Sequence, residues 1–398
     1  MDYVHVVGLG IDDKKIFSHL YYLVKKADLI VGGIRCLEKV PDDVRGKRLC
    51  LKGSMEKVIK RVLSEQEKGK FIVVLADGDP LFYGIGKRLI EFLGEKRIKF
   101  YPAPTTLQIA ASRLKISWED VKVISLHGRG DIWPLFRAVT FNDLIGIYTD
   151  ARFNPLALTK ILLERGVNNF RMIIFEDLGL ETERITSYDN IAEIPGDINI
   201  SPLNFVLLQK IKSSPLHFYP GMDDRCYKYE NGVITKKEIR LISIGQLKLN
   251  EDNTLWDLGA GCGSVAIEAS FFLRYGKVYA VEKNKKRFEM MVHNIRQTGA
   301  YLVEPVHGVM PECLQNLPDP DRIFIGGGVG KTIDVLKSAC ERLLPGGILV
   351  VNAVLLGTLE RVRKYFESLG WEYDISEINV ARSKELGEDL RFEPLTPV

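Results

Sequence analysis

Three alternate glycines and one distant carboxylate are spaced to hold a nucleoside. The run "LWDLGAGCGS" starts at residue 255 and places Gly259, Gly261 and Gly263 between an apolar stretch and a helical pattern. Glycines in that position let the backbone approach a ligand closely, at the edge where an open α/β sheet binds nucleotide-like molecules. Glu282 follows nineteen residues after Gly263, where a carboxylate can accept both hydroxyls of a ribose. We therefore expect a ribose-containing ligand here.

The spacing of these glycines argues against a pyrophosphate. A dinucleotide loop needs G-x-G-x-x-G, whereas here the third glycine comes one residue early and position 264 is serine. S-adenosylmethionine has a ribose and no phosphate, and its sulfonium tolerates a nearby carboxylate. We expect this cofactor on Asp257, Gly259, Ala260, Gly261, Cys262, Gly263 and Glu282. The alternative is a tight strand-to-helix turn without a ligand.

A second glycine-rich segment, "IGGGVGKT" at 325–332, does not fit a nucleoside triphosphate loop. That loop needs a glycine five positions before Gly330, and position 325 is isoleucine. The segment also occupies the place where amino-group methyltransferases of nucleic acids and proteins usually carry Asn/Asp-Pro-Pro-aromatic. We therefore do not expect an exocyclic nitrogen as the methyl acceptor.

The first half of the chain carries glycine turns of its own. "VVGLG" spans residues 6–10, and the Gly-Asp-Pro within "ADGDPLFYGIG" (76–86) follows an apolar run and predicts a turn with exposed amides. Thr105 and Thr106 can cap the helix that follows while they face a ligand. A plain helix cap is the alternative for both threonines.

Two α/β regions are needed to position these residues. In the first half, apolar runs at 3–8, 71–76, 121–126 and 144–149 alternate with helical patterns. A stretch rich in Pro, Gly, Ser and Asp follows residue 211, and we place a domain boundary there. Beyond it, a helix at about 235–246 and five apolar runs predict a doubly wound, mostly parallel sheet. The predicted domains are residues 1–212 and 213–398.

The composition is that of a globular protein whose net charge produces no strong electrostatic field. The formal net charge of +3 comes from 55 basic and 52 acidic residues, so nothing points to nucleic acid or to an anionic membrane. The six cysteines form no C-x-x-C pair, which speaks against a zinc site and a disulfide framework. No apolar segment approaches the ~20 residues that a bilayer span requires. We expect a cytoplasmic protein without a bound metal.

Four blocks of the second half resemble the precorrin C15-methyltransferase and decarboxylase family of cobalamin biosynthesis. They are "GVITKKEIR" (232–240), "LWDLGAGCGSVAIEAS" (255–270), "DPDRIFIGGGVG" (319–330) and "VVNAVLL" (350–356). The resemblance covers residues 216–398. It implies that Thr235 and the 259–263 loop hold the cofactor, Glu282 holds its ribose, and Gly308 and Val309 lie against its adenine.

Two basic residues of the first block are candidates for substrate binding. Lys236 and Arg240 lie four residues apart, hence on one helical face. In this family they would meet carboxylates of the substrate. A solvated surface face is the alternative.

The first half resembles the tetrapyrrole methylases, whose two α/β lobes hold the same cofactor between them. The matching motifs are "VVGLG", "ADGDPLFYGIG", "PAPTTLQIAASRL" (102–114) and "SLHGR" (125–129), of which the last is similar to the precorrin C5-methyltransferases. The first loop reads Gly-Leu-Gly where the family usually has Gly-Pro-Gly. The resemblance implies cofactor contacts for Gly8, Gly10, Asp77, Gly78, Asp79, Pro80, Thr105 and Thr106.

Two residues of the "SLHGR" motif are candidates for substrate binding. His127 and Arg129 would hydrogen-bond acetate or propionate groups of the substrate. A hydrogen-bonded core histidine is the alternative for His127.

Together the two halves resemble the precorrin-6Y C5,15-methyltransferase (decarboxylating) family, which joins both activities in one chain. The resemblance implies methylation of a precorrin-6B-type tetrapyrrole at carbons 5 and 15, one S-adenosylmethionine per domain, and loss of carbon dioxide from an acetate side chain. Positioning and desolvation would supply most of the rate, so no dedicated nucleophile is expected and no catalytic residue is assigned.

Two functions of other classes stay open at this point. One is a non-catalytic S-adenosylmethionine-binding scaffold, and the other is an RNA methyltransferase, which the near-neutral charge disfavours. The substrate either contains cobalt or is metal-free. We expect a homo-oligomer without a nucleic-acid or membrane partner.

Overall fold

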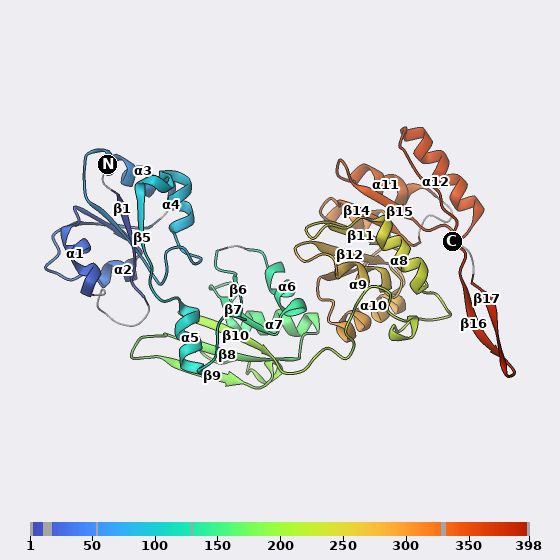
Figure 1. Ribbon diagram of the computed structural model, residues 1–398, viewed down its shortest axis with the longest axis horizontal. Helices are drawn as coiled ribbons and strands as arrows, with labels where there is room; N and C mark the ends of the chain where they lie inside the picture. Colours follow the sequence, from blue (N-terminus) through green and yellow to red (C-terminus); the bar gives the residue numbers. More distant parts are fainter. Residues whose placement is uncertain (1–2, 11–17, 53–54, 129, 328–331, 396–398) are drawn as a thin grey trace. The chain divides into compact units, whose positions relative to one another are not determined.

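The computed structural model describes residues 3–10, 18–52, 55–128, 130–327 and 332–395 (Figure 1). The chain forms two compact units. The first comprises Met1–Asp131, Asp143–Lys160 and Phe170–Gln209, and the second comprises Ile132–Asn142, Ile161–Asn169 and Lys210–Val398. The predicted boundary at residue 212 lies close to the last crossing between the units. That two domains can be separated there stays a prediction.

A parallel sheet forms the first lobe of the first unit. Its order in the described residues is β3-β2-β4-β1-β5, and each neighbouring pair is parallel. The strands are β1 (Val4–Gly8), β2 (Leu29–Gly32), β3 (Lys47–Cys50), β4 (Ile72–Ala76) and β5 (Ile98–Tyr101). The helical segments of this lobe are α1 (Ser18–Lys26), α2 (Ile34–Glu38), α3 (Met55–Glu67), α4 (Gly86–Leu93) and η1 (Glu95–Arg97).

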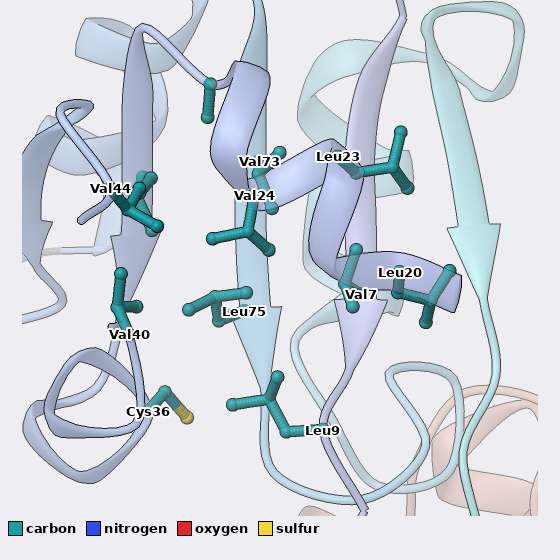
Figure 2. Close-up of a cluster of buried hydrophobic side chains, with 12 residues drawn as sticks. Val7, Leu9, Leu20, Leu23, Val24, Cys36, Val40, Val44, Val73 and Leu75 are labelled. Atoms are coloured by element: carbon teal, nitrogen blue, oxygen red, sulfur yellow. The ribbon is translucent and has the colours of Figure 1, made fainter. Parts of the chain in front are cut away.

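Helices cover both faces of this sheet, which explains why its central strands are continuous apolar runs. Strand β4 is buried along its whole length. On one face, Val7 and Leu75 belong to the same core cluster as Val24 of α1 and Cys36 of α2 (Figure 2). This packing fixes the carboxyl ends of β1 and β4, where the predicted glycine turns begin.

The second lobe of the first unit contains a mixed sheet. Its order in the described residues is β6-β7-β10-β8-β9, with β6 parallel to β7 and antiparallel pairing of β7 with β10 and of β8 with β9. The strands are β6 (Lys122–Ser125), β7 (Leu144–Tyr148), β8 (Phe170–Glu176), β9 (Arg184–Tyr188) and β10 (Asn204–Lys210). Helix α5 (Thr106–Leu114) and the short η2 (Ile191–Glu193) belong to this unit.

The second unit is built on a parallel sheet of order β13-β12-β11-β14-β15 in the described residues. The strands are β11 (Thr254–Leu258), β12 (Lys277–Glu282), β13 (Val303–His307), β14 (Arg322–Ile325) and β15 (Ile348–Val351). The order reverses between β11 and β14, and the carboxyl ends of strands at such a reversal form the usual ligand crevice. The predicted doubly wound α/β fold is confirmed.

Helices pack around this second sheet. They are α8 (Lys237–Gln246) before the first strand, α9 (Ser264–Ser270), α10 (Lys285–Thr298) and α11 (Asp334–Arg342) between strands, and α12 (Leu356–Leu369) after the last, with the short η3 (Asp224–Cys226) and η4 (Glu312–Asn316). Helix α6 (Trp133–Phe141) also belongs to this unit, and α7 (Pro155–Arg165) begins in the first unit and ends in the second.

A hairpin of β16 (Ala381–Leu386) and β17 (Asp389–Pro394) ends the described chain. It forms an antiparallel sheet of its own rather than extending the parallel one. Among the described residues, no helix combines the length and apolar character needed to cross a membrane.

Candidate functional site

The glycine loop after β11 requires glycine by conformation. Gly259, Gly261 and Gly263 have φ angles of +76°, +58° and +81°, in the left-handed region that residues with a Cβ rarely adopt. Gly263 is also the N-cap residue of α9. The alternate glycines therefore turn the chain from strand to helix, as the sequence predicted.

Two of these glycines are also required by packing, and one is not. A Cβ on Gly259 would lie 2.9 Å from the backbone of Gly327, and one on Gly263 would lie 2.7 Å from Cγ of Met291. A Cβ on Gly261 would meet no atom of the described residues within 4 Å. The loop therefore leaves open space at Gly261, which a tight turn alone would not require.

Glu282 ends β12 and holds this loop. Its Oε2 accepts a hydrogen bond from the Gly261 amide at 2.9 Å, and its Oε1 accepts one from the Asn284 amide at 2.7 Å. The residue is 5% exposed. Each carboxylate oxygen has a second lone pair, so Glu282 can still accept hydroxyl groups while it fixes the loop.

Asp257 lies in β11 with one carboxylate oxygen lacking a partner. Its Oδ2 accepts a hydrogen bond from the Ala266 amide at 3.0 Å, whereas Oδ1 is buried with no hydrogen-bond partner among the described residues. Burial raises the pKa of Asp257 to about 7, the Ala266 amide opposes this, and the charge of Glu282 adds to it. An orphaned carboxylate oxygen beside a glycine loop suits a cationic ligand group.

Asn294 of α10 is a positioning residue that no sequence motif indicated. Its Nδ2 donates to Cys262 O at 2.9 Å and to Lys228 O at 3.0 Å, and its Oδ1 accepts from the Lys228 amide at 2.8 Å. Cys262 itself is buried, and burial raises the pKa of its thiol. Asn294 therefore ties the segment before α8 to the glycine loop.

The structure corrects the prediction for Arg240. Its guanidinium is fully buried and donates to Glu268 at 2.7 Å, to Asp224 at 3.1 Å and to the backbone oxygen of Met222 at 2.6 Å. It also donates to Thr235 O and lies over the ring of Tyr227. With its donors engaged inside the protein, Arg240 cannot meet a substrate carboxylate in this arrangement; it joins the segment before α8 to α8 and α9.

Lys236 and Thr235 lie at the start of α8. Lys236 is the half-buried N-cap residue, and its Nζ donates to Gly232 O at 3.3 Å. Thr235 is also half-buried. Lys236 and Arg240, predicted to share a face, therefore have different surroundings, because Arg240 turns into the core.

Gly308 and Val309 follow β13. The Gly308 amide donates to Glu282 O at 3.3 Å, and a Cβ on Gly308 would lie 2.6 Å from Cβ of Cys313. Val309 is 61% exposed. An exposed apolar side chain beside the backbone of Glu282 is compatible with packing against an adenine. Of the second glycine-rich segment, 325–332, residues 328–331 lie outside the described residues.

In the first unit, the ends of β1 and β4 approach each other closely. A Cβ on Gly8 would lie 2.5 Å from Gly78 O, so only glycine fits there. Gly10 and Gly78 have φ angles of +68° and +61°. The Leu9 amide donates to Ala76 O at 2.9 Å and holds the two turns side by side. The structure thus brings Gly8 and Gly78 together, and Gly10 lies two residues beyond Gly8 in the same turn.

The Gly-Asp-Pro turn is closed by its own hydrogen bonds. Asp79 Oδ1 accepts from the Leu81 amide at 2.8 Å, and Pro80 O accepts from the Gly86 amide at 2.8 Å. Asp77 is exposed, pairs with Arg35 at 3.2 Å, and accepts from the thiol of Cys36 at 3.4 Å. Burial, reinforced by Asp77, raises the pKa of Cys36 to about 12, so this thiol stays protonated.

Thr105 is an N-cap residue, which was the alternative to a ligand contact in the sequence analysis. Its hydroxyl accepts from the Gln108 amide at 3.3 Å, and Gln108 Oε1 accepts from the Thr105 amide at 2.8 Å, which completes a capping box for α5. Thr106 is the first residue of that helix and interacts with the hydroxyl of Tyr148. A ligand role is not needed to explain Thr105.

His127 is exposed and does not belong to the core. Its Nδ1 lies 3.1 Å from Thr149 O. The neighbouring Gly128 amide donates to Asp150 at 2.9 Å, and Asp150 also accepts from the amides of Arg152 and Phe153. Asp150 thus fixes the histidine loop, a role that no sequence motif signalled. Arg129, the other predicted substrate residue, lies outside the described residues.

No group of three or more His, Cys, Asp or Glu side chains in the described parts of the chain is arranged to hold a metal ion. The six cysteines are free thiols.

Comparison with known proteins gives a family match for each half. Residues 3–194 match the tetrapyrrole (corrin/porphyrin) methylases, and residues 226–398 match the precorrin methyltransferase domain. A precorrin-6Y C(5,15)-methyltransferase [decarboxylating] of Sinorhizobium sp is 29% identical over 402 residues, which cover 99% of this chain and 92% of that protein. A probable cobalt-precorrin-6B C(15)-methyltransferase (decarboxylating) of Pyrobaculum calidifontis is 35% identical over 182 residues, 45% of this chain and 93% of that protein.

The chain belongs to the precorrin-6Y C5,15-methyltransferase (decarboxylating) family. A solved precorrin-6Y C5,15-methyltransferase from Geobacter metallireducens is 37% identical and covers 44% of this chain and 94% of its own, with a TM-score of 0.43. A uroporphyrin-III C-methyltransferase from Thermus thermophilus, solved with S-adenosylhomocysteine, is 20% identical, covers 52% and 98% of the two chains, and has a TM-score of 0.44. The family resemblance drawn from the sequence motifs is confirmed.

Proposed function

We propose that this chain methylates a precorrin-6B-type tetrapyrrole at carbons 5 and 15 and removes carbon dioxide from one of its acetate side chains. The observation that carries the proposal is the match of the chain, over 99% of its length, to a protein named for both methylations and the decarboxylation. The two family models cover the two halves in the same order. An enzyme of cobalamin biosynthesis is therefore favoured over a scaffold or an RNA methyltransferase.

The division of labour follows from the same matches. We assign the carbon 5 methylation to residues 1–212 and the carbon 15 methylation with decarboxylation to residues 213–398. The second assignment is supported by the relative of Pyrobaculum calidifontis, whose name gives those two activities and which this chain matches over 182 residues.

S-adenosylmethionine is the proposed methyl donor in each domain. In the second unit the residues fit this cofactor on three points: open space at Gly261, an orphaned carboxylate oxygen on Asp257, and the carboxylate of Glu282 beside the loop. Ala260, Cys262, Gly263, Thr235, Gly308 and Val309 complete the proposed cofactor site. When bound, the cofactor would supply an electrophilic methyl group.

In the first unit the cofactor would lie on the turns that follow β1 and β4. Gly8, Gly10 and Gly78 bring the backbone close enough for a ligand to contact amides, and Asp77, Asp79 and Pro80 shape the same turn. We keep Thr105 and Thr106 in this proposed site through the backbone at the start of α5. His127, Arg129 and Lys236 remain proposed contacts to substrate carboxylates.

The residues of the chain act by positioning rather than by covalent chemistry. The glycine turns and the buried acids would fix where a ligand lies. In the decarboxylation, the electron pair of the broken carbon–carbon bond passes into the conjugated ring, and a proton then replaces the lost carboxyl group. We assign no side chain to that proton transfer.

Incubation with methyl-labelled S-adenosylmethionine and precorrin-6B, in metal-free and cobalt-bearing forms, tests the proposal. The expected product carries two labelled methyl groups and has lost one carbon dioxide, as read by mass spectrometry. Cofactor binding without any product would favour the scaffold, and labelling of added RNA would favour the RNA methyltransferase. The proposed homo-oligomer and cytoplasmic location are tested separately, by solution mass and by fractionation.

A further inference from the structure

A polar cavity of about 710 Å³ lies beside the start of α8. Its walls come from residues 223–229, from the first residues of α8, and from β16 of the terminal hairpin. Arg225, Tyr229, Lys236, Lys237 and Arg382 are the cationic and aromatic side chains in these walls. The predicted function assigns only Lys236 among them.

The acids of this cavity already have partners. Asp223 holds Arg225 by two hydrogen bonds, at 3.0 and 3.2 Å. Arg382 donates to Glu238 at 2.6 and 3.2 Å and to Asp224 at 3.1 Å. Because both arginines are neutralised by carboxylates of the wall, neither leaves an excess charge for a ligand.

Two lysines remain that form no close ion pair, although Lys237 interacts by charge at longer range with Asp223 and Glu238 and helps to lower their pKa values. No ion pair within 4.0 Å joins Lys236 or Lys237 to an acid among the described residues, and Lys236 donates to Gly232 O and lies 5.8 Å over the ring of Tyr229. Both lysines are half-buried, as the N-cap and first residue of α8, and the N-cap makes no side-chain cap. Positive side chains are unfavourable at the positive end of a helix, and an anion would relieve them.

Hydrogen bonds connect the wall of the cavity to the glycine loop. Asn294 holds both Lys228 and Cys262 O, and Tyr227 donates to Glu268 of α9 at 3.0 Å. The segment that carries Arg225 and Tyr229 is therefore fixed against the elements that carry the proposed cofactor site.

We propose that this cavity is the subsite that takes a carboxylate side chain of the tetrapyrrole during the carbon 15 reaction. Lys236 and Lys237 bind the carboxylate, and the ring of Tyr229 packs against the methylene group that bears it. The inference rests on the proposed function. It assigns Lys237, in place of the buried Arg240, as the second cation that binds the substrate.

The test is a double substitution, Lys236→Gln with Lys237→Gln, in the full chain. Loss of two charge-assisted contacts predicts a KM for precorrin-6B raised about 10- to 100-fold in the carbon 15 reaction, with kcat and the affinity for S-adenosylmethionine unchanged. Lys337→Gln is the matched control, because Lys337 is exposed on α11 and does not line the cavity. Arginine at both positions should restore most of the parental KM.

Folding and substrate charge provide independent readouts. Removal of two positive charges relieves repulsion at the start of α8 but also removes the attraction of Lys237 to Asp223 and Glu238, so the double variant should unfold near the parental temperature. A substrate with its carboxylates esterified should bind parent and double variant equally. A parental KM in a folded double variant overturns this subsite, whereas absence of carbon 15 methylation by the parent overturns the proposed function instead.

Discussion

Asp257 combines two features that are unfavourable without a ligand: a buried position and an oxygen that has no partner in the described parts of the chain. Burial raises its pKa to about 7, with a further contribution from the nearby charge of Glu282. An acid with a raised pKa stabilises the fold most when protonated, so its contribution is complete below about pH 4 and is lost as the pH rises toward 7. A cationic ligand group would reverse this cost by favouring the carboxylate.

We therefore predict that Asp257→Asn increases stability at pH 8 relative to the parent. The difference in unfolding free energy between variant and parent should grow between about pH 4 and 7, reach a few kcal/mol, and then stay constant. In that range only the parent, through the Asp257 carboxyl, releases a proton on unfolding. Denaturant unfolding of both proteins from pH 4 to 8 measures it. A gap that does not change with pH would show that Asp257 is already ionised in the folded state.

Glu282 offers a second prediction at the same scale. Glu282→Ala removes the acceptor of the Gly261 amide and the proposed acceptor of two ribose hydroxyls, so S-adenosylmethionine affinity in the second unit should fall at least about 100-fold. Glu282→Gln should also weaken binding, since its amide group can offer a donor where Gly261 or Asn284 already donates. Calorimetry measures both, and the site of the first unit is the internal control. Parental affinity in either variant would mean that the ribose is held elsewhere.

Single residues were predictable from the sequence where the backbone itself dictates their type. The spacing of Gly259, Gly261 and Gly263 indicated a loop that the φ angles bear out. Arg240 was misplaced because a spacing of four residues predicts a shared face and does not say whether that face is buried. Asn294 and Asp150 act through backbone groups distant in sequence, which leaves no local signal.

Among the elements, α8 carries a fully buried cation, Arg240. Arg240 neutralises Glu268 of α9, which is itself fully buried, and Asp224 of η3. Arg240→Ala leaves Glu268 buried without its cation and should destabilise the second unit by about 3–5 kcal/mol. Arg363→Ala, which breaks exposed pairs on α12, should cost far less, because solvent screens those pairs. Equal losses in the two variants, measured by denaturant unfolding, would contradict the role given to Arg240.

The order of elements follows from the sequence more closely than their pairing does. Each apolar run after residue 250 became a parallel strand, because runs buried on both faces are typical of parallel sheets. In the second lobe, runs of the same kind became a mixed sheet, since an apolar run does not encode strand direction. The terminal hairpin carries mostly exposed residues, so no pattern of apolar residues predicted its two strands.

At the scale of the whole molecule, the two units each carry a glycine turn on a sheet of their own. We predict two S-adenosylmethionine sites per chain by calorimetry, and independent binding, because the proposed cofactor residues of each site belong to one unit. Separation of the chain after residue 212 leaves Ile132–Asn142 and Ile161–Asn169 of the second unit in the first half, and should still give two folded halves with one site each. One site in the intact chain would contradict the proposal of one cofactor per domain.

The most direct test of the division of labour is the mass of the product made by Gly261→Val. Valine adds a branched side chain in the open space at Gly261, where the positive φ angle is also unfavourable for it. Gly346→Val is the matched control, since Gly346 has a φ angle of +77° and equally open surroundings but precedes β15, away from the carboxyl ends of the strands. In folded Gly261→Val we predict methylation at carbon 5 on a suitable intermediate, with neither methylation at carbon 15 nor loss of carbon dioxide. Release of carbon dioxide at the parental rate by Gly261→Val would contradict the assignment of that reaction to the second unit.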